Sequence, residues 1–238
     1  MTGGKRDSIN HTDIKRLFLF FFDEEDMRMA QEIAKFREAR DVPHWEVDPH
    51  STVDTLREMM SPLEQKIGGK GIDNLLYGKA GSRYCGNWET RDRMLYRTLQ
   101  YSLSKIVWYY MPRDSIRESC EYVQHATKRK LRADISKTST GSLGFLIREA
   151  RTRKLLDSTF LTQLDLVDGI GRIAKHEYGK EYVMMDDSDE CLKSQVFNMT
   201  EAVCMYFVCR KIGELLLGTG LERNQAAVNR QAQNELMN

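Results

Sequence analysis

Arg172 and His176 are the residues of this sequence whose types and spacing best fit acid–base chemistry on a phosphate group. They lie four positions apart in the stretch GRIAKHEYG, which follows an apolar periodic run. On a helix, this spacing puts both side chains on one face. Histidine titrates near neutral pH and can take or give a proton, whereas arginine stays charged and binds phosphate through forked hydrogen bonds. These two roles suffice for metal-free cleavage of RNA, in which a 2′-hydroxyl attacks the adjacent phosphate.

A purely structural interpretation fits the same segment. Asp168, Arg172 and His176 follow one another at four-residue steps, so Asp168 and Arg172 can form an ordinary ion pair on a helix surface. A histidine near a helix C-terminus is also favoured by the helix dipole without any catalytic role. Spacing alone leaves both interpretations open.

Basic residues gather in two stretches upstream of this pair. The first stretch contains Lys128, Arg129, Lys130 and Arg132, and the second contains Arg148, Arg151, Arg153 and Lys154. If the helices that carry them are neighbours, these charges would form one positive face near Arg172 and bind a phosphate backbone in a salt-dependent manner. Alternatively, Glu149 and Asp134 balance the charges of a solvated face. The sequence has no aromatic RNA-recognition motif, so contacts would be with the backbone rather than with bases.

The elements that must position these residues are helical. The periodicity of apolar residues predicts helices over 12–40 with a break near Asp23, and over 51–60, 88–111, 114–133, 143–156, 158–176 and 191–217. Thr12 and Ser51 are predicted N-caps, and Gly218 is predicted to end the last helix. The stretch YVMM, residues 182–185, is the only strand candidate. Successive helices joined by short turns predict an all-α antiparallel bundle.

Glycine-rich residues 68–87 divide the chain. The sequence predicts a helical N-terminal region at 1–86 that ends in this connector, a helical bundle at 87–220 and a polar tail at 221–238. The pieces GGKG and GKAGS in the connector lack the spacing of a phosphate-binding loop, which favours a plain connector. The N-terminal run Leu17–Phe22 has too many apolar residues for one face of a lone helix. Part of it should therefore meet the main bundle or another subunit.

Composition limits the classes of function. Of 238 residues, 41% are apolar and 30% are charged, and the net charge of +1 gives no overall bias towards nucleic acid or membrane. The N-terminal apolar run of six residues is too short to span a membrane. Five cysteines without zinc-site spacing favour a reducing, intracellular and cytoplasmic setting. The stretch HWEVDPH, residues 44–50, suits a loop or a metal site, and we expect a loop, without a metal or other cofactor.

The stretch TGSLGFLIREARTRKLLDSTFLTQLDLVDGIGRIAKHEYG resembles the second half of HEPN domains, a family of helical nucleotide-binding and ribonuclease domains. The matching residues are Leu143, Gly144 and Ile147 in a short helix, Lys154, Leu155, Leu156 and Asp157 after it, and Arg172, His176 and Gly179 in the arginine–histidine motif. The segment DSIRESCEYVQHATKRKL is similar to the opening helix of the family, and residues 207–217 to its closing helix. The resemblance covers roughly residues 100–217.

The resemblance implies an RNA-binding homodimer in which the Arg172–His176 corners of two copies face one cleft. In the active form, a metal-independent endoribonuclease of the toxin or antiviral-defence type, His176 is the acid–base group and Arg172 steadies the phosphate. Lys175 and the basic stretches would hold the RNA. Three residues separate Arg172 from His176 here, where the family usually has more. The alternative is a catalytically inactive helical module for dimerisation or nucleic-acid binding, including a viral nucleoprotein-like role.

Overall fold

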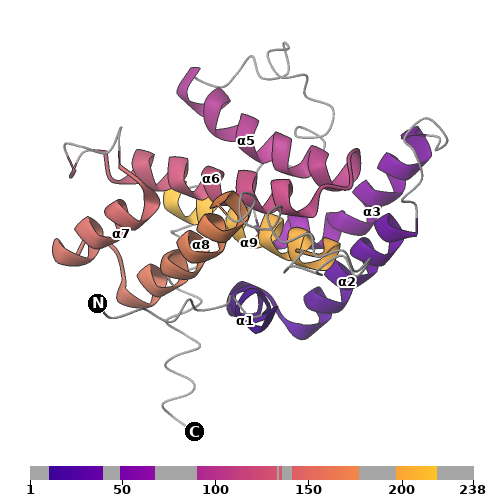
Figure 1. Ribbon diagram of the computed structural model, residues 1–238, viewed down its shortest axis with the longest axis horizontal. Coiled ribbons are helices and arrows are strands. Elements are labelled where there is room, and N and C mark those ends of the chain that lie inside the picture. Colours follow the sequence, from indigo (N-terminus) through magenta and orange to yellow (C-terminus); the bar gives the residue numbers. More distant parts are fainter. Residues whose placement is uncertain are drawn as a thin grey trace, which may run out of the picture.

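The computed structural model describes residues 11–39, 49–67, 90–132, 134–135, 141–176 and 197–218. Within these ranges the chain forms helices and no strand (Figure 1). The helices are α1 (His11–Phe21), α2 (Glu24–Glu38), α3 (Pro49–Ile67), α5 (Thr90–Val107), α6 (Pro112–Lys130), α7 (Leu143–Thr152), α8 (Ser158–His176) and α9 (Met199–Leu217). The predicted all-α bundle is confirmed for this part of the chain. The strand candidate at 182–185, the connector at 68–87 and the tail at 221–238 lie outside it.

Helix α9 is the centre of the molecule. Most of its 19 residues are buried, and it packs against α1, α2, α3, α5 and α6. Figure 1 shows it in the middle of the other helices. This position follows from its sequence, because a helix that is apolar all round must be covered all round. Asn198 and Glu201 form a capping box at its start, and Gly218 ends it with a left-handed φ of 81°, as predicted.

The N-terminal helices share this core. Leu17 and Phe18 of α1 are fully buried, and the Phe22 ring meets the Phe207 ring of α9 edge-on at 6.4 Å between centroids. The expectation that part of the run Leu17–Phe22 meets the main bundle is therefore confirmed.

A buried ion pair fixes α3 against α9. Arg210 of α9 pairs with Glu64 of α3, and only 1% and 8% of these residues are exposed. Burial lowers the pKa of Arg210 to about 10, while the nearby carboxylate of Glu214 acts in the opposite direction. Removing one partner of such a pair typically costs about 3–5 kcal/mol, because the other charge is left buried and uncompensated.

Two glycines allow neighbouring helices to approach α6 closely. A β-carbon at Gly213 of α9 would lie 2.2 Å from a ring carbon of Tyr122, and one at Gly171 of α8 would lie 2.9 Å from the β-carbon of Cys120. The contact of Gly171 with Cys120 sets the distance between α8, which carries Arg172, and α6.

Several predicted helix boundaries agree with the structure and others are wrong. The break near Asp23 is confirmed, because Asp23 starts α2 with a capping box. Helix α8 also has its predicted bounds. Thr12 is not an N-cap, since α1 already begins at His11. Likewise Ser51 lies inside α3, which extends over Pro49–Ile67.

Three other boundary errors have local causes, and α5 also ends earlier than predicted, at Val107 rather than at 111. Helix α6 begins at Pro112, because proline is tolerated in the first helical turn, where its missing N–H group has no partner to lose. Helix α7 ends at Thr152 rather than at 156, and Lys154 just beyond it has a positive φ of 53°. Helix α9 begins at Met199 rather than at 191, because Asn198 caps it.

Alanine at Gly213 should destabilise the protein, because the new methyl group would overlap the Tyr122 ring. Overpacking of this kind typically costs about 1–3 kcal/mol. Gly169→Ala is the matched control, since a β-carbon there meets nothing within 4 Å, and alanine in a helix interior is favoured over glycine by about 0.5–1 kcal/mol. Urea denaturation should show a loss of unfolding free energy at 213 and a gain at 169. Equal changes in unfolding free energy for the two variants would contradict the close approach of Gly213 to the Tyr122 ring.

Candidate functional site

A cleft of about 680 Å³ opens between α6, α7 and α8. Its basic lining residues are Arg117, Arg148, Arg151, Arg172 and Lys175. Its acidic lining residues are Glu121, Asp165 and Asp168. Because the cations outnumber the carboxylates, the cleft favours an anionic ligand despite the near-neutral charge of the whole chain.

Arg172 is exposed and ion-paired. Its Nε lies 3.2 Å from Oδ2 of Asp168, and 70% of its side chain is accessible to solvent. The ion pair that the four-residue spacing predicts is therefore present. Because most of the arginine side chain is in solvent, an incoming phosphate can reach the guanidinium and compete with Asp168 for it.

Asp168 lies where α8 meets the N-terminus of α7. Its side chain is only 16% exposed, and the backbone N–H of Gly144 donates a hydrogen bond to its carboxylate. A β-carbon at Gly144 would lie 3.0 Å from Oδ2, so glycine lets the first turn of α7 press against this carboxylate. Burial raises the pKa of Asp168, while Arg172 and the Gly144 N–H act in the opposite direction.

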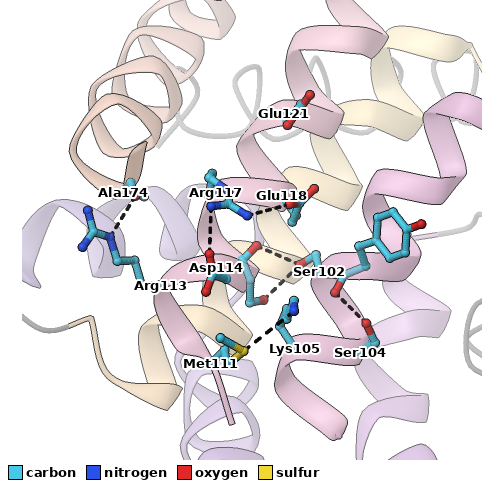
Figure 2. Close-up of polar contacts among 12 residues, drawn as sticks. Ser102, Ser104, Lys105, Met111, Arg113, Asp114, Arg117, Glu118, Glu121 and Ala174 are labelled. Carbon is cyan, nitrogen blue, oxygen red and sulfur yellow. Dashed lines mark hydrogen bonds and ion pairs between the residues drawn. The ribbon is translucent and has the colours of Figure 1, made fainter. Parts of the chain in front are cut away.

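The cations of the cleft differ in how far they are neutralised. Arg151 pairs with Asp165, and Arg117 pairs with Asp114 and Glu118 of its own helix (Figure 2). By contrast, Arg148 lies 6.0 Å from the centroid of the Phe145 ring. Within the described ranges, neither Arg148 nor Lys175 has a carboxylate at ion-pair distance. These two side chains therefore carry the uncompensated positive charge of the cleft.

The structure divides the basic residues that the sequence singles out. Arg148, Arg151, Arg172 and Lys175 come together in the cleft. Lys128, Arg129, Lys130 and Arg132 lie at the end of α6 and in the turn after it, and they do not line the cleft. Arg153 is bound to the Glu149 carboxylate and to the backbone carbonyl of Asp134. Lys154 is exposed and follows α7.

His176 is the last residue of α8, and its side chain lies outside the described part of the structure. The helical turn before it is anchored from α6. Nε of Arg113 donates a 2.9 Å hydrogen bond to the carbonyl oxygen of Ala174 (Figure 2). This contact holds the end of α8 against the start of α6 and so sets the direction of the Arg172–His176 segment.

Arg113 and Gly144 help to position the cleft through contacts that the local sequence does not reveal. The hydrogen bond from Arg113 joins residues 61 positions apart, so no local sequence pattern predicts it. In the sequence, Gly144 stands out only through its match to HEPN domains, because its packing against Asp168 depends on how α7 and α8 meet.

Two further observations concern metal binding and membrane spans. Among the described residues, no group of three or more histidine, cysteine, aspartate or glutamate side chains has the arrangement of a metal site. The HWEVDPH stretch lies outside the side chains that the structure describes. None of the described helices is both long and apolar enough to cross a membrane.

Comparisons with protein-family models, with curated proteins and with solved structures give no match. The resemblance to HEPN domains therefore depends on the sequence motifs quoted above.

The unfolding free energy of Asp168→Asn should increase relative to that of the wild-type protein as the pH rises above about 4, which is near the ordinary pKa of an aspartate. Because folding raises the pKa of Asp168, its carboxyl adds no cost while both states are protonated; the cost grows as the pH rises above the ordinary aspartate value and is complete once the pH passes the raised value. Asparagine has no proton to lose. Urea unfolding from pH 4 to pH 8 measures the difference, and Asp165→Asn controls for the loss of one carboxylate. A difference between wild type and Asp168→Asn that stays constant over this range would contradict the burial of the charge.

Proposed function

We propose that the protein binds RNA through backbone phosphates in the cleft between α6, α7 and α8, and that its active form cleaves RNA there without a metal ion. One observation carries this proposal. Arg148 and Lys175 lack carboxylate partners among the described residues, and they share one cleft with the exposed Arg172. Charge of this kind binds polyanions through phosphate contacts and counterion release.

The proposed chemistry needs one proton acceptor and one fixed cation. His176 takes the proton of the 2′-hydroxyl as its oxygen bonds to the adjacent phosphorus, and a proton is returned to the 5′-oxygen as the P–O5′ bond breaks. The products are a 2′,3′-cyclic phosphate and a 5′-hydroxyl end. Arg172 stabilises the negative charge on the non-bridging oxygens. It would exchange its contact with Asp168 for one with phosphate.

The HEPN resemblance supports a homodimer, in which the Arg172–His176 corners of two copies face a shared cleft. In that arrangement each strand of RNA meets two arginines and two histidines. The intracellular, reducing setting inferred from the cysteines suits an enzyme of the toxin or antiviral-defence type.

A second candidate function is RNA binding without cleavage. The ion pair between Arg172 and Asp168 favours it, because a guanidinium held by a carboxylate is less available to a transition state. The short spacing between Arg172 and His176 points the same way. Both candidates use the same cleft, so they differ in chemistry and not in the place of binding.

His176→Ala should abolish cleavage of labelled RNA in the presence of a chelator, with a loss of about 10²–10⁴-fold for a general acid–base group. His125→Ala is the matched control, because His125 lies on α6 beside Glu121 of the cleft and has no assigned role. Denaturing gels follow the cleavage, and circular dichroism checks the fold. Equal cleavage by wild type and His176→Ala would remove the catalytic assignment. Binding of RNA that stays intact would select the second candidate.

Replacing Arg148 and Lys175 together with glutamine should weaken RNA binding. With two fewer phosphate contacts, the slope of log K against log salt should become shallower by about 1.4, at about 0.7 per contact for a single strand. Lys130 and Arg132, changed together to glutamine, are the matched control because they remove the same charge outside the cleft. Fluorescence anisotropy at several salt concentrations measures both. A larger loss of RNA affinity in the control variant would indicate that RNA binds at the end of α6 and not in the cleft.

A further inference from the structure

The outer side of α5 carries cations and aromatic rings in alternation. Arg97, Tyr101, Lys105 and Tyr109 follow one another at four-residue steps, the last just beyond the end of the helix. Arg97, Tyr101 and Lys105 lie along one side of the helix and advance by about 6 Å per step, and Tyr109 adjoins them because its ring contacts Nζ of Lys105. We call these four residues the α5 stripe.

The two rings of the α5 stripe are unusually exposed for this molecule. Tyr101 is 38% exposed and Tyr109 is 60% exposed, whereas Leu95, Leu99, Leu103, Ile106 and Val107 on the other side of α5 are at most 3% exposed. Met111, 39% exposed, lies beside Tyr109 in the chain. The stripe is therefore not part of the core that holds α5 against α6 and α9.

The two cations of the stripe contact rings rather than carboxylates. The guanidinium carbon of Arg97 lies 5.3 Å from the Tyr101 ring centroid, and its Nε donates a 2.7 Å hydrogen bond to the tyrosine hydroxyl. Nζ of Lys105 lies 4.8 Å from the Tyr109 centroid and 3.7 Å from the Met111 sulfur (Figure 2). Within the described ranges, neither cation has a carboxylate at ion-pair distance.

This arrangement differs from that of the neighbouring helix. Figure 2 shows Arg117 of α6 held between Asp114 and Glu118, so its charge is compensated locally. The charges of Arg97 and Lys105 are not compensated in this way. Their rings hold them in place through cation–π contacts, which leaves the positive charge available to an anion.

We infer that the α5 stripe is a stacking platform for single-stranded RNA, with bases on Tyr101 and Tyr109 and phosphates on Arg97 and Lys105. The inference rests on the proposed function and deepens it, because it makes the partner a single strand whose bases are free to stack. Aromatic side chains interleaved with cations are the recurring solution for binding single strands without sequence preference. In a duplex, the faces of the bases are already stacked on one another.

Charge also decides between RNA and a second copy of the chain as the occupant. In a two-fold symmetric interface, the same patch from each copy meets itself. Two α5 stripes would then bring four uncompensated cations together without a carboxylate of the stripe to offset them. A polyanion matches this surface and a second copy does not.

The test compares a double leucine variant, Tyr101→Leu with Tyr109→Leu, and the matched phenylalanine double variant. Phenylalanine keeps the ring face, and leucine keeps apolar bulk without it. Stacking is worth about 1–3 kcal/mol per base, or roughly five- to 150-fold in affinity. With a fluorescent 12-nucleotide single-stranded RNA, the leucine variant should bind at least tenfold more weakly and the phenylalanine variant within about twofold of wild type.

The outcomes separate this inference from the proposed function. Unchanged affinity of the leucine variant, while the Arg148 and Lys175 variant loses binding, would overturn the platform and leave the cleft in place. The reverse pattern would support the platform and overturn the cleft. A leucine variant that changes its mass in light scattering and keeps its RNA affinity would make the stripe a protein interface and overturn the inference. Absence of RNA binding by the wild-type protein would overturn both proposals.

Discussion

The burial of α9 on every side is the constraint on which the rest of this structure depends. A helix with apolar residues all round has no face to offer to water, so α1, α2, α3, α5 and α6 must surround it. The polar surfaces of these helices then form the outside of the molecule. Helix α6 contacts α9 on one side and presents Arg117, Glu121 and Gln124 to the cleft on the other. The candidate site therefore lies in the outer layer of helices, and the packing of α6 against α9 fixes the position of the site.

The immediate surroundings of each cation decide how far its charge is compensated in this molecule. The chain is almost neutral overall, yet several of its described cations differ sharply in their surroundings. Arg210 is buried and compensated by Glu64. Arg151 and Arg172 are at the surface and paired with nearby aspartates. Arg97 and Lys105 lie against aromatic rings. Cations of this last kind, together with Arg148 and Lys175, combine uncompensated charge with a place in a cleft or beside exposed rings, and the proposed function and the further inference both use them.

The sequence predicts the features that depend on residues close together in the chain. The apolar stripe of Leu95, Leu99 and Leu103 specifies α5, and the bounds of α8 and the pairing of Asp168 with Arg172 follow from helical spacing. Features that depend on how helices meet could not be predicted. The bond from Arg113 to Ala174 and the contact of Gly144 with Asp168 join segments whose relative position is set by packing. For the same reason, the basic residues of α6 and α7 form two groups where the sequence suggested one face.

The position of α9 in the chain has a consequence for biosynthesis. Translation proceeds from the N-terminus, and the central helix follows every other described helix in the sequence. While the ribosome is still making residues 199–217, the surrounding helices have no common partner, and their apolar sides, such as Leu17 and Phe18, are open to solvent or to chaperones. Completion of the core must therefore wait until this segment has emerged from the exit tunnel, although α5, α6, α7 and α8 also contact one another directly. A nonsense codon before residue 199 would release a chain whose helices lack the central partner that α1, α2, α3, α5 and α6 share.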